Sequence, residues 1–225
     1  MLFGILIDDI DTLADYGLIL CAEVSIGSPK PRTTYVTIPE ADGDLDLTGA
    51  LTGGVVRYEP RMVSLELFPV YDVVDNRAKP ATEAHVTLVR SSLSARTHGK
   101  KCKVWLPDDF NHYFYGRVTI GDRGGYNSGK IPVTVVADPY RYKTEITKKT
   151  VTASGTQVFT NETMRTVPTF TATDATATVT FKAVSHQLRP GDNTFEDIVL
   201  EPGINSVAFS NVNNPIVVTY QEGTF

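Results

Sequence analysis

The stretch IPVTVVADPYRYKTE, residues 131–145, divides this chain into two parts. Its first half alternates Val133, Val135 and Ala137 with Thr134 and Val136, a pattern typical of a β-strand with one more apolar face. Asp-Pro then follows, and proline has no N–H to give to a ladder. The sequence therefore predicts a strand over residues 131–137 that ends at this dipeptide.

The residues around the Asp-Pro pair also mark a change in composition. The single Trp, both Cys and nine of the ten Tyr precede residue 144, and short Thr-rich segments follow it. We interpret this as a junction at Asp138, Pro139, Tyr140 and Arg141. The predicted domains are residues 1–143 and 144–225.

The composition is that of a soluble, moderately acidic protein. The net charge is −5, with 16 basic against 19 acidic residues in 1–145 and 5 against 7 in 146–225. Neither part is basic, so the charge does not indicate nucleic-acid binding. No apolar run approaches the ~20 residues of a membrane span, and no signal peptide is recognised. Cys21 and Cys102 lie in alternating patterns and are expected to be buried thiols.

The first part is predicted to be mainly β with one helix. The helix is expected over residues 80–97, with Pro80 in its first turn and His98-Gly99 ending it. Two segments rich in glycine and polar residues, Pro39–Gly54 and Gly121–Gly129, are expected to be loops. Strands are expected at residues 16–26, 33–38, 55–58, 62–68, 102–106, 113–120 and 131–137.

The second part is predicted to be entirely β. Threonine supplies 16 of its last 80 residues, and β-branched side chains favour strands. Short alternating segments separated by Gly, Pro, Asn and Asp indicate a small sandwich or jelly roll. Strands are expected at residues 147–152, 157–159, 169–173, 176–183, 194–200, 206–209 and 216–220.

Several motifs of known chemistry are approached but not completed. Residues 124–131 match a phosphate loop only in part, because the Ser or Thr that would bind Mg²⁺ is missing and a strand follows. Asp42, Asp44 and Asp46 have the spacing of a calcium loop without its Gly and Glu, so a solvated acidic turn is favoured over an ion site. The four His and two Cys lack zinc spacing. We therefore predict no catalytic, cofactor-binding or metal-binding residues.

Beyond these local patterns, the order of the segments resembles the distal tail proteins of phages with long non-contractile tails. No single piece is diagnostic, but their order and spacing together are specific. The pieces are residues 10–12, 15–18, 35–48 (YVTIPEADGDLDLT), Tyr58, Arg61, 99–109 (GKKCKVWLPDD), 115–118 and 138–143, followed less closely by 201–205 and 216–223.

The resemblance implies a mainly β protein with an N-terminal β-sandwich domain carrying one helix and a C-terminal galectin-like β-sandwich, a jelly roll. It also implies a homo-oligomer, a hexameric ring that joins the tail tube protein to the tail-associated hub protein and contacts other baseplate proteins. DNA would pass through the ring unbound. The expected location is the virion tail tip after synthesis in the host cytoplasm, without membrane insertion. No insertion long enough for a receptor-binding-protein arm is found in the second domain.

A ring subunit needs a stiff β framework and loops that reach its neighbours. We therefore expect Asp42, Asp44, Asp46, Arg123 and Tyr126, in the two long loops, to lie at subunit contacts or along the lumen.

Two alternatives remain open at this stage. One is a carbohydrate-binding module that uses the second domain, although five of its six Phe (Phe159, Phe170, Phe181, Phe195 and Phe209) mostly occupy strand patterns and are expected in the core. The other is a tail-tube or terminator protein, against which the appended second domain argues.

Overall fold

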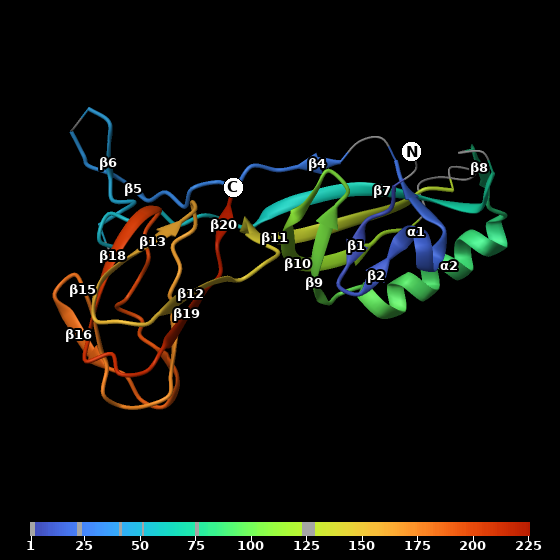
Figure 1. The fold of residues 1–225 in the computed structure, drawn as a ribbon. Coiled ribbons are helices and arrows are strands. Elements are labelled where there is room, and N and C mark those ends of the chain that lie inside the picture. Colours follow the sequence, from blue (N-terminus) through green and yellow to red (C-terminus); the bar gives the residue numbers. More distant parts are fainter. Residues whose placement is uncertain (1–2, 22–23, 41, 51, 75–76, 123–128) are drawn as a thin grey trace. The chain divides into compact units, whose positions relative to one another are not determined.

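The computed structural model describes residues 3–21, 24–40, 42–50, 52–74, 77–122 and 129–225. The chain is mainly β, which confirms the expected fold class, and the strand pairs among the described residues are antiparallel. It divides into two compact units, residues 1–140 (unit 1) and 141–225 (unit 2) (Figure 1). Among the described residues, no helix is long and apolar enough to cross a membrane.

Unit 1 is built on one curled sheet with the strand order β2-β1-β9-β10-β11-β7-β3, and β4 and β8 also pair with β7. Its strands are β1 (Leu6–Ile7), β2 (Ile10–Asp11), β3 (Leu18–Leu20), β4 (Ser25–Ile26), β7 (Arg61–Val74), β8 (Arg77–Pro80), β9 (Lys101–Leu106), β10 (Asp109–Ile120) and β11 (Ile131–Lys143). Val133 on β11 is in register with Leu65 on β7. These apolar alternations fill one core, against which helix α2 (Glu83–Thr97) packs Val89 and Leu93.

The strand expected over residues 16–26 is wrong in its extent. The chain instead forms a short helix, α1 (Thr12–Tyr16), and then the two separate strands β3 and β4, both paired with β7. Asp11 caps α1 by accepting hydrogen bonds from two backbone N–H groups, and Gly17 ends it at a φ of 62°. These caps end one element and begin the next inside what the sequence presents as one alternating run.

The long helix begins later than expected. Thr82 is its N-cap and accepts a hydrogen bond from the His85 N–H, so the helix starts at Glu83 and ends at Thr97. Pro80 is therefore not in the first helical turn but at the end of β8. A threonine hydroxyl that satisfies a free helix N–H sets the boundary here, not the favourable φ of proline.

Strand β11 does not end at Asp138-Pro139 as predicted. It pairs with β7 as far as Ala137, opposite Arg61, and then with β20 (Gly223–Thr224) at Arg141 and Tyr142. Proline removes only its own N–H, and Pro139 lies between the last residue paired with β7 and the first paired with β20. The strand therefore continues while its partner changes.

Unit 2 contains two four-stranded sheets, β12-β19-β14-β17 and β13-β18-β15-β16. The strands are β12 (Thr147–Val151), β13 (Gly155–Asn161), β14 (Thr169–Ala172), β15 (Thr178–Phe181), β16 (Val184–Gln187), β17 (Gly191–Thr194), β18 (Gly203–Ser210) and β19 (Ile216–Tyr220). Buried residues from both sheets, including Phe159, Phe170 and Phe209, form one core between them. This is a β-sandwich, as expected.

The strand predicted at residues 194–200 is wrong. Strand β17 ends at Thr194, and a turn follows in which the Ile198 N–H donates to the Phe195 carbonyl. Ile198 and Leu200 are both fully buried. Apolar residues therefore alternate here because Ile198 is buried in a turn and Leu200 forms an isolated β-bridge with Thr166, and not because the segment is an extended strand.

Candidate interaction surfaces

The most unusual part of unit 1 is the segment that joins β4 to β7. No described side chain from Ser25 to Pro60 is buried, although the backbone there is regularly hydrogen-bonded. By contrast, strand β9 and the first half of β11 bury every second side chain in the core of unit 1. A long ordered segment that contributes nothing to its own core indicates a surface made for a partner.

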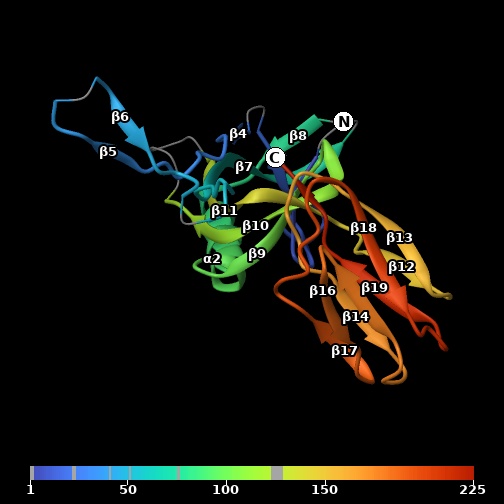
Figure 2. The same ribbon diagram turned by 90° about the vertical axis from the view of Figure 1, so that its left-hand side faces the viewer.

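The middle of this segment is a hairpin, which we call the arm (residues 34–48). Strand β5 (Tyr35–Thr37) pairs with β6 (Asp44–Asp46), and the two form a sheet separate from the main sheet (Figure 2). The loop expected over Pro39–Gly54 is therefore partly strand. An isolated two-stranded hairpin is only marginally stable in water, so the arm gains stability from any surface that covers it.

One face of the arm is apolar. Side chains of alternate residues lie on the same face of a strand, and Val36 pairs directly with Leu45. The face is completed by Ile38 and Leu47, and the four residues are 43%, 48%, 43% and 36% exposed in the order Val36, Leu45, Ile38 and Leu47. Four large apolar side chains in a row, each about half in water, are typical of an interface.

The opposite face of the arm is acidic. Asp44 accepts a hydrogen bond from the Thr37 hydroxyl at 2.8 Å, and Asp46 accepts one from the Thr48 N–H at 2.8 Å. Hydrogen bonds from the side chain of Thr48, and then from its backbone, lower the pKa of Asp46, so this carboxylate stays ionised. Asp42 lies in the turn before β6.

The three aspartates do not make a metal site in this geometry. Within the described ranges, no group of three or more His, Cys, Asp or Glu residues is arranged to hold a metal ion. The carboxylates of Asp44 and Asp46 accept hydrogen bonds from neighbouring threonines, as expected for a solvated acidic hairpin.

The base of the arm is closed by backbone pairing and carries positive charge. Pro31 forms an isolated β-bridge with Tyr58, and the Arg32 N–H donates to the Arg57 carbonyl at 2.8 Å. The strand expected over residues 55–58 is therefore reduced to this single bridge. Beside Arg32 and Arg57 is a recess of about 390 Å³, which we call the base recess. It is lined by Arg32, Thr34, Leu47, Thr48, Ala50, Thr52 and Arg57.

The junction residues support this base. The ring of Tyr140 meets that of Tyr58 edge-on, with centroids 6.1 Å apart. Arg141 donates from Nη2 to the Phe225 carbonyl at 3.0 Å within unit 2. Asp138 and Pro139 lie on the continuous strand β11. Arg123 and Tyr126, with most of the partial phosphate-loop match, lie outside the described residues.

A second exposed patch lies on the main sheet of unit 1. Met62 on β7 and Val136 on β11 are a directly opposed pair and are both about half exposed. A groove of about 580 Å³ nearby contains Cys21 and the ion pair between Lys130 and Glu66, whose Nζ–Oε2 distance is 2.6 Å. Burial raises the pKa of Cys21, and it raises that of Cys102 to about 11. Burial therefore favours the protonated thiol over the reactive thiolate at both positions.

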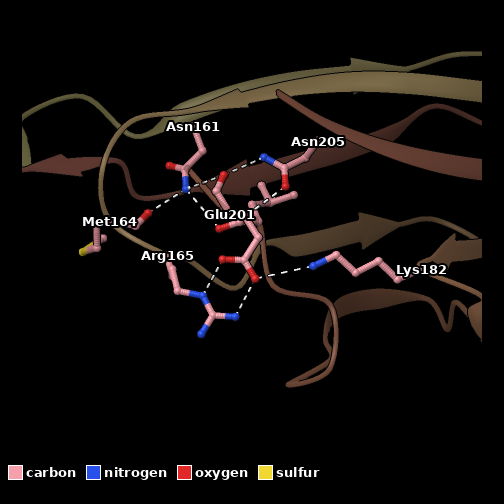
Figure 3. Close-up of polar contacts among 7 residues, drawn as sticks. Asn161, Met164, Arg165, Lys182, Glu201 and Asn205 are labelled. Carbon is pink, nitrogen blue, oxygen red and sulfur yellow. Dashed lines mark hydrogen bonds and ion pairs between the residues drawn. The ribbon is translucent and has the colours of Figure 1, made fainter. Parts of the chain in front are cut away.

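Unit 2 contains a polar cluster that the sequence reading missed (Figure 3). The buried Asn205 side chain accepts from the Glu201 N–H at 2.8 Å and donates to the Glu201 carbonyl at 2.7 Å, which fixes the turn before β18. Arg165 donates two hydrogen bonds to the Glu201 carboxylate, and Lys182 lies 3.5 Å from it. These cations lower the pKa of Glu201, Arg165 having the larger effect.

The same turn occurs twice in unit 2. The buried Asn193 accepts from the Arg189 N–H at 2.9 Å and donates to the Arg189 and Gly191 carbonyls, as Asn205 does for Glu201 and Gly203. The glycines have φ values of 95° and 91°, which favour glycine. The repeated pattern Leu-X-Pro-Gly-X-Asn at residues 188–193 and 200–205 was the available sequence signal.

The aromatic residues of unit 2 offer no open platform among the described residues. Four of the five Phe expected in the core are buried. The fifth, Phe195, is half-buried between the His186 ring, stacked at 4.2 Å, and Phe170, whose centroid is 6.2 Å away. His186 is further held by Asp197, with Nε2 2.7 Å from the carboxylate. These residues line a groove of about 750 Å³, in which the His186 and Phe195 rings are stacked on each other and do not form an open platform.

Comparison with known proteins shows a similarity in fold but not in sequence. No protein-family model matches the chain, and no curated protein matches it by sequence. Among solved structures, the fold is similar to that of the SPP1 Dit protein (gp 19.1), which is described as a paradigm of the hub adsorption apparatus of phages that infect Gram-positive bacteria. The match has a TM-score of 0.67 and 16% identity, and it covers 100% of both chains. The two proteins therefore share a fold over their full lengths, as the sequence resemblance implied.

Proposed function

We propose that this chain is a structural component of a phage tail tip that assembles with copies of itself into a ring. The observation that carries the proposal is the segment from Ser25 to Pro60, in which no described side chain is buried. A subunit that works alone has no use for such a segment, whereas a ring subunit needs a surface for each neighbour. The fold shared with a phage hub protein supports the same assignment.

In this proposal the ring is a hexamer that joins the tail tube to the hub and leaves a channel for DNA. The apolar face of the arm (Val36, Ile38, Leu45 and Leu47) packs on a neighbouring subunit. The acidic face, with Asp44 and Asp46, is directed to the channel. An acidic wall suits DNA passage, because cationic side chains would hold the phosphates by counterion release. The chain acts by assembly, without catalysis, and is located in the virion.

The division of labour follows from the two separate cores. Unit 1 and unit 2 each have a buried apolar cluster of their own. We therefore propose that residues 1–143 form the ring and that residues 144–225 are a galectin-like appendage. Light scattering and negative-stain imaging of the full chain test the first point, since closed rings are expected. A chain that stays monomeric up to high concentration and after addition of the tail tube and hub proteins contradicts it.

Two fragments test the second point. Residues 1–143 are expected to self-associate, and residues 144–225 are expected to be folded, β-rich and monomeric by circular dichroism and size-exclusion chromatography. If residues 144–225 alone formed rings, unit 2 and not unit 1 would be responsible for assembly. Specific binding of that fragment on a glycan array would instead favour a carbohydrate-binding role.

A further inference from the structure

The charges of the arm and of its base are segregated. The tip of the arm carries Glu40 and Asp42, and no basic residue occurs between residues 33 and 56. The base recess is lined by Arg32 and Arg57. The side chains of these four residues are exposed, and none makes a hydrogen bond or ion pair with the rest of the described chain.

The base recess has the chemistry of a site for a short acidic and apolar segment. Its volume of about 390 Å³ compares with about 30 Å³ for one water in the liquid, so several side-chain groups fit. Leu47 and Ala50 supply apolar surface, and the two guanidinium groups of Arg32 and Arg57 can each bind a carboxylate in a bidentate manner. Leu47 also belongs to the apolar face of the arm, so the apolar face leads into the recess.

The tip of the arm has the matching chemistry. It presents Ile38 and Pro39 followed by Glu40, and Asp42 comes two residues later. Glu40 has a φ of +65°, in the left-handed region that non-glycine residues seldom adopt. A carboxylate therefore occupies a turn position where the backbone favours glycine, which points to a use for that carboxylate.

We propose that the tip of the arm of one copy docks in the base recess of the next copy, with Glu40 and Asp42 facing Arg32 and Arg57. The hairpin pairing of β5 with β6 holds the tip away from its own base, so the contact is made between copies. Such a contact joins two different surfaces head to tail, and head-to-tail contacts close into rings when the rotation permits. This inference rests on the proposed ring and names the residues that close it.

Charge reversal tests the contact directly. Glu40→Lys with Asp42→Lys, and separately Arg32→Glu with Arg57→Glu, are each expected to weaken self-association about tenfold or more, because like charges then face each other. The chain with all four changes is expected to recover association to within about threefold of the unchanged protein, because the pairs are restored with opposite polarity. Sedimentation over a concentration series measures these constants, and circular dichroism checks the fold.

Matched controls use exposed charges of unit 2. Glu145→Lys with Glu196→Lys repeats the first change in charge, and Lys148→Glu with Arg189→Glu repeats the second. Both controls are expected to leave association within about threefold of the unchanged protein. The proposal is overturned if the Glu40/Asp42 reversal weakens self-association no more than its control does. It is also overturned if the variant with all four changes is folded but does not recover self-association.

A positional test does not depend on electrostatics. Glu40→Cys combined with Arg57→Cys is expected to give, on oxidation, a ladder of covalent oligomers, because each copy then links to two neighbours. Either single variant is expected to stop at the dimer or below. A double variant without a ladder, in a protein that still forms rings by imaging, overturns the docking site and leaves the proposed function standing. Absence of rings in the unchanged protein would instead remove the proposed function itself.

Discussion

Unit 2 and the arm of unit 1 treat their exposed charges in opposite ways. In unit 2 the carboxylates of Glu201 and Asp197 are bonded to Arg165 and His186 within the same unit. In the arm region, Glu40, Asp42, Arg32 and Arg57 have no such partner among the described residues. These two carboxylates of unit 2 are therefore paired within their own unit, whereas the four charged residues at the tip and base of the arm have partners that are expected on another molecule.

The same contrast holds for apolar surface. The sandwich of unit 2 encloses its aromatic residues between two sheets, while the arm leaves Val36, Ile38 and Leu45 about half exposed. A fold that is complete gains stability from its own core. An arm of this kind gains it by mass action when a neighbour binds. Substitutions in the two regions should consequently change different measured quantities.

The largest expected effect on folding is in the core of unit 2. Phe170 is fully buried and contacts the rings of Phe195 and Phe209. Phe170→Ala is expected to lower the free energy of unfolding of residues 144–225 by about 3–5 kcal/mol, measured by urea denaturation. Self-association through unit 1 should persist in the full chain. Loss of rings together with the fold of unit 2 would show that the two units are not independent.

The next largest effect is expected on assembly and not on folding. Replacing Val36 and Leu45 by Ser removes the centre of the apolar face of the arm, and self-association should weaken by on the order of 2 kcal/mol, about thirtyfold. The melting temperature of the dilute monomer should change little, because surface changes cost about 0.5 kcal/mol or less. Val158→Ser, an equally exposed position of unit 2, is the control. Equal association of the two variants would remove the apolar face from the interface.

A smaller effect on folding is expected at the repeated turn. Asn205→Ala removes the buried side chain that satisfies the backbone of Glu201 and Gly203, leaving part-buried polar groups without their partner. Its cost should be about 1–3 kcal/mol by chemical denaturation. Asn213→Ala, which loses one exposed hydrogen bond to Thr176, should cost about 0.5 kcal/mol or less. Similar values for both would show that the Asn205 turn does not need its side chain.

The smallest effect is a pH dependence at Glu201. Its folded-state pKa is lowered chiefly by Arg165, so the carboxylate contributes stability above its unfolded pKa, near 4.3. That contribution is lost as the pH falls through the lowered pKa. Glu201→Gln should therefore cost about 1 kcal/mol or less at pH 7, and progressively less as the pH falls through the lowered pKa. A difference from the unchanged protein that stays constant between pH 7 and pH 3 would exclude an electrostatic cause.

Much of the fold could be predicted from local patterns. The alternations at residues 62–68, 102–106 and 131–137 predicted strands of the main sheet, because a strand that covers a core must place an apolar residue at every second position. Phe159, Phe170, Phe181 and Phe209 were correctly expected in the core of unit 2 for the same reason, whereas Phe195 is only half-buried. The helix was found because its apolar residues repeat with helical spacing.

Element boundaries could not be predicted in the same way. Alternation over residues 16–26 could not reveal that Gly17 ends a helix and that β3 and β4 pair separately with β7. Nor could Asp138-Pro139 show that β11 finds a new partner in β20, more than 80 residues along the chain. A strand continues or ends according to what lies beside it, and that neighbour is brought there by the tertiary fold.

The candidate site shows the same division most clearly. The amino-acid sequence was enough to predict that residues 39–54 are polar, acidic and outside the core, because their Gly, Pro and Asp content disfavours a core element. That Val36 and Leu45 form an uncovered face, and that Arg32 and Arg57 share a recess, could be seen only in the folded structure. The sequence pattern of alternate apolar residues is the same whether those residues face a core or water. The difference is set by the rest of the fold, which packs on β7 and β11 and leaves the arm uncovered.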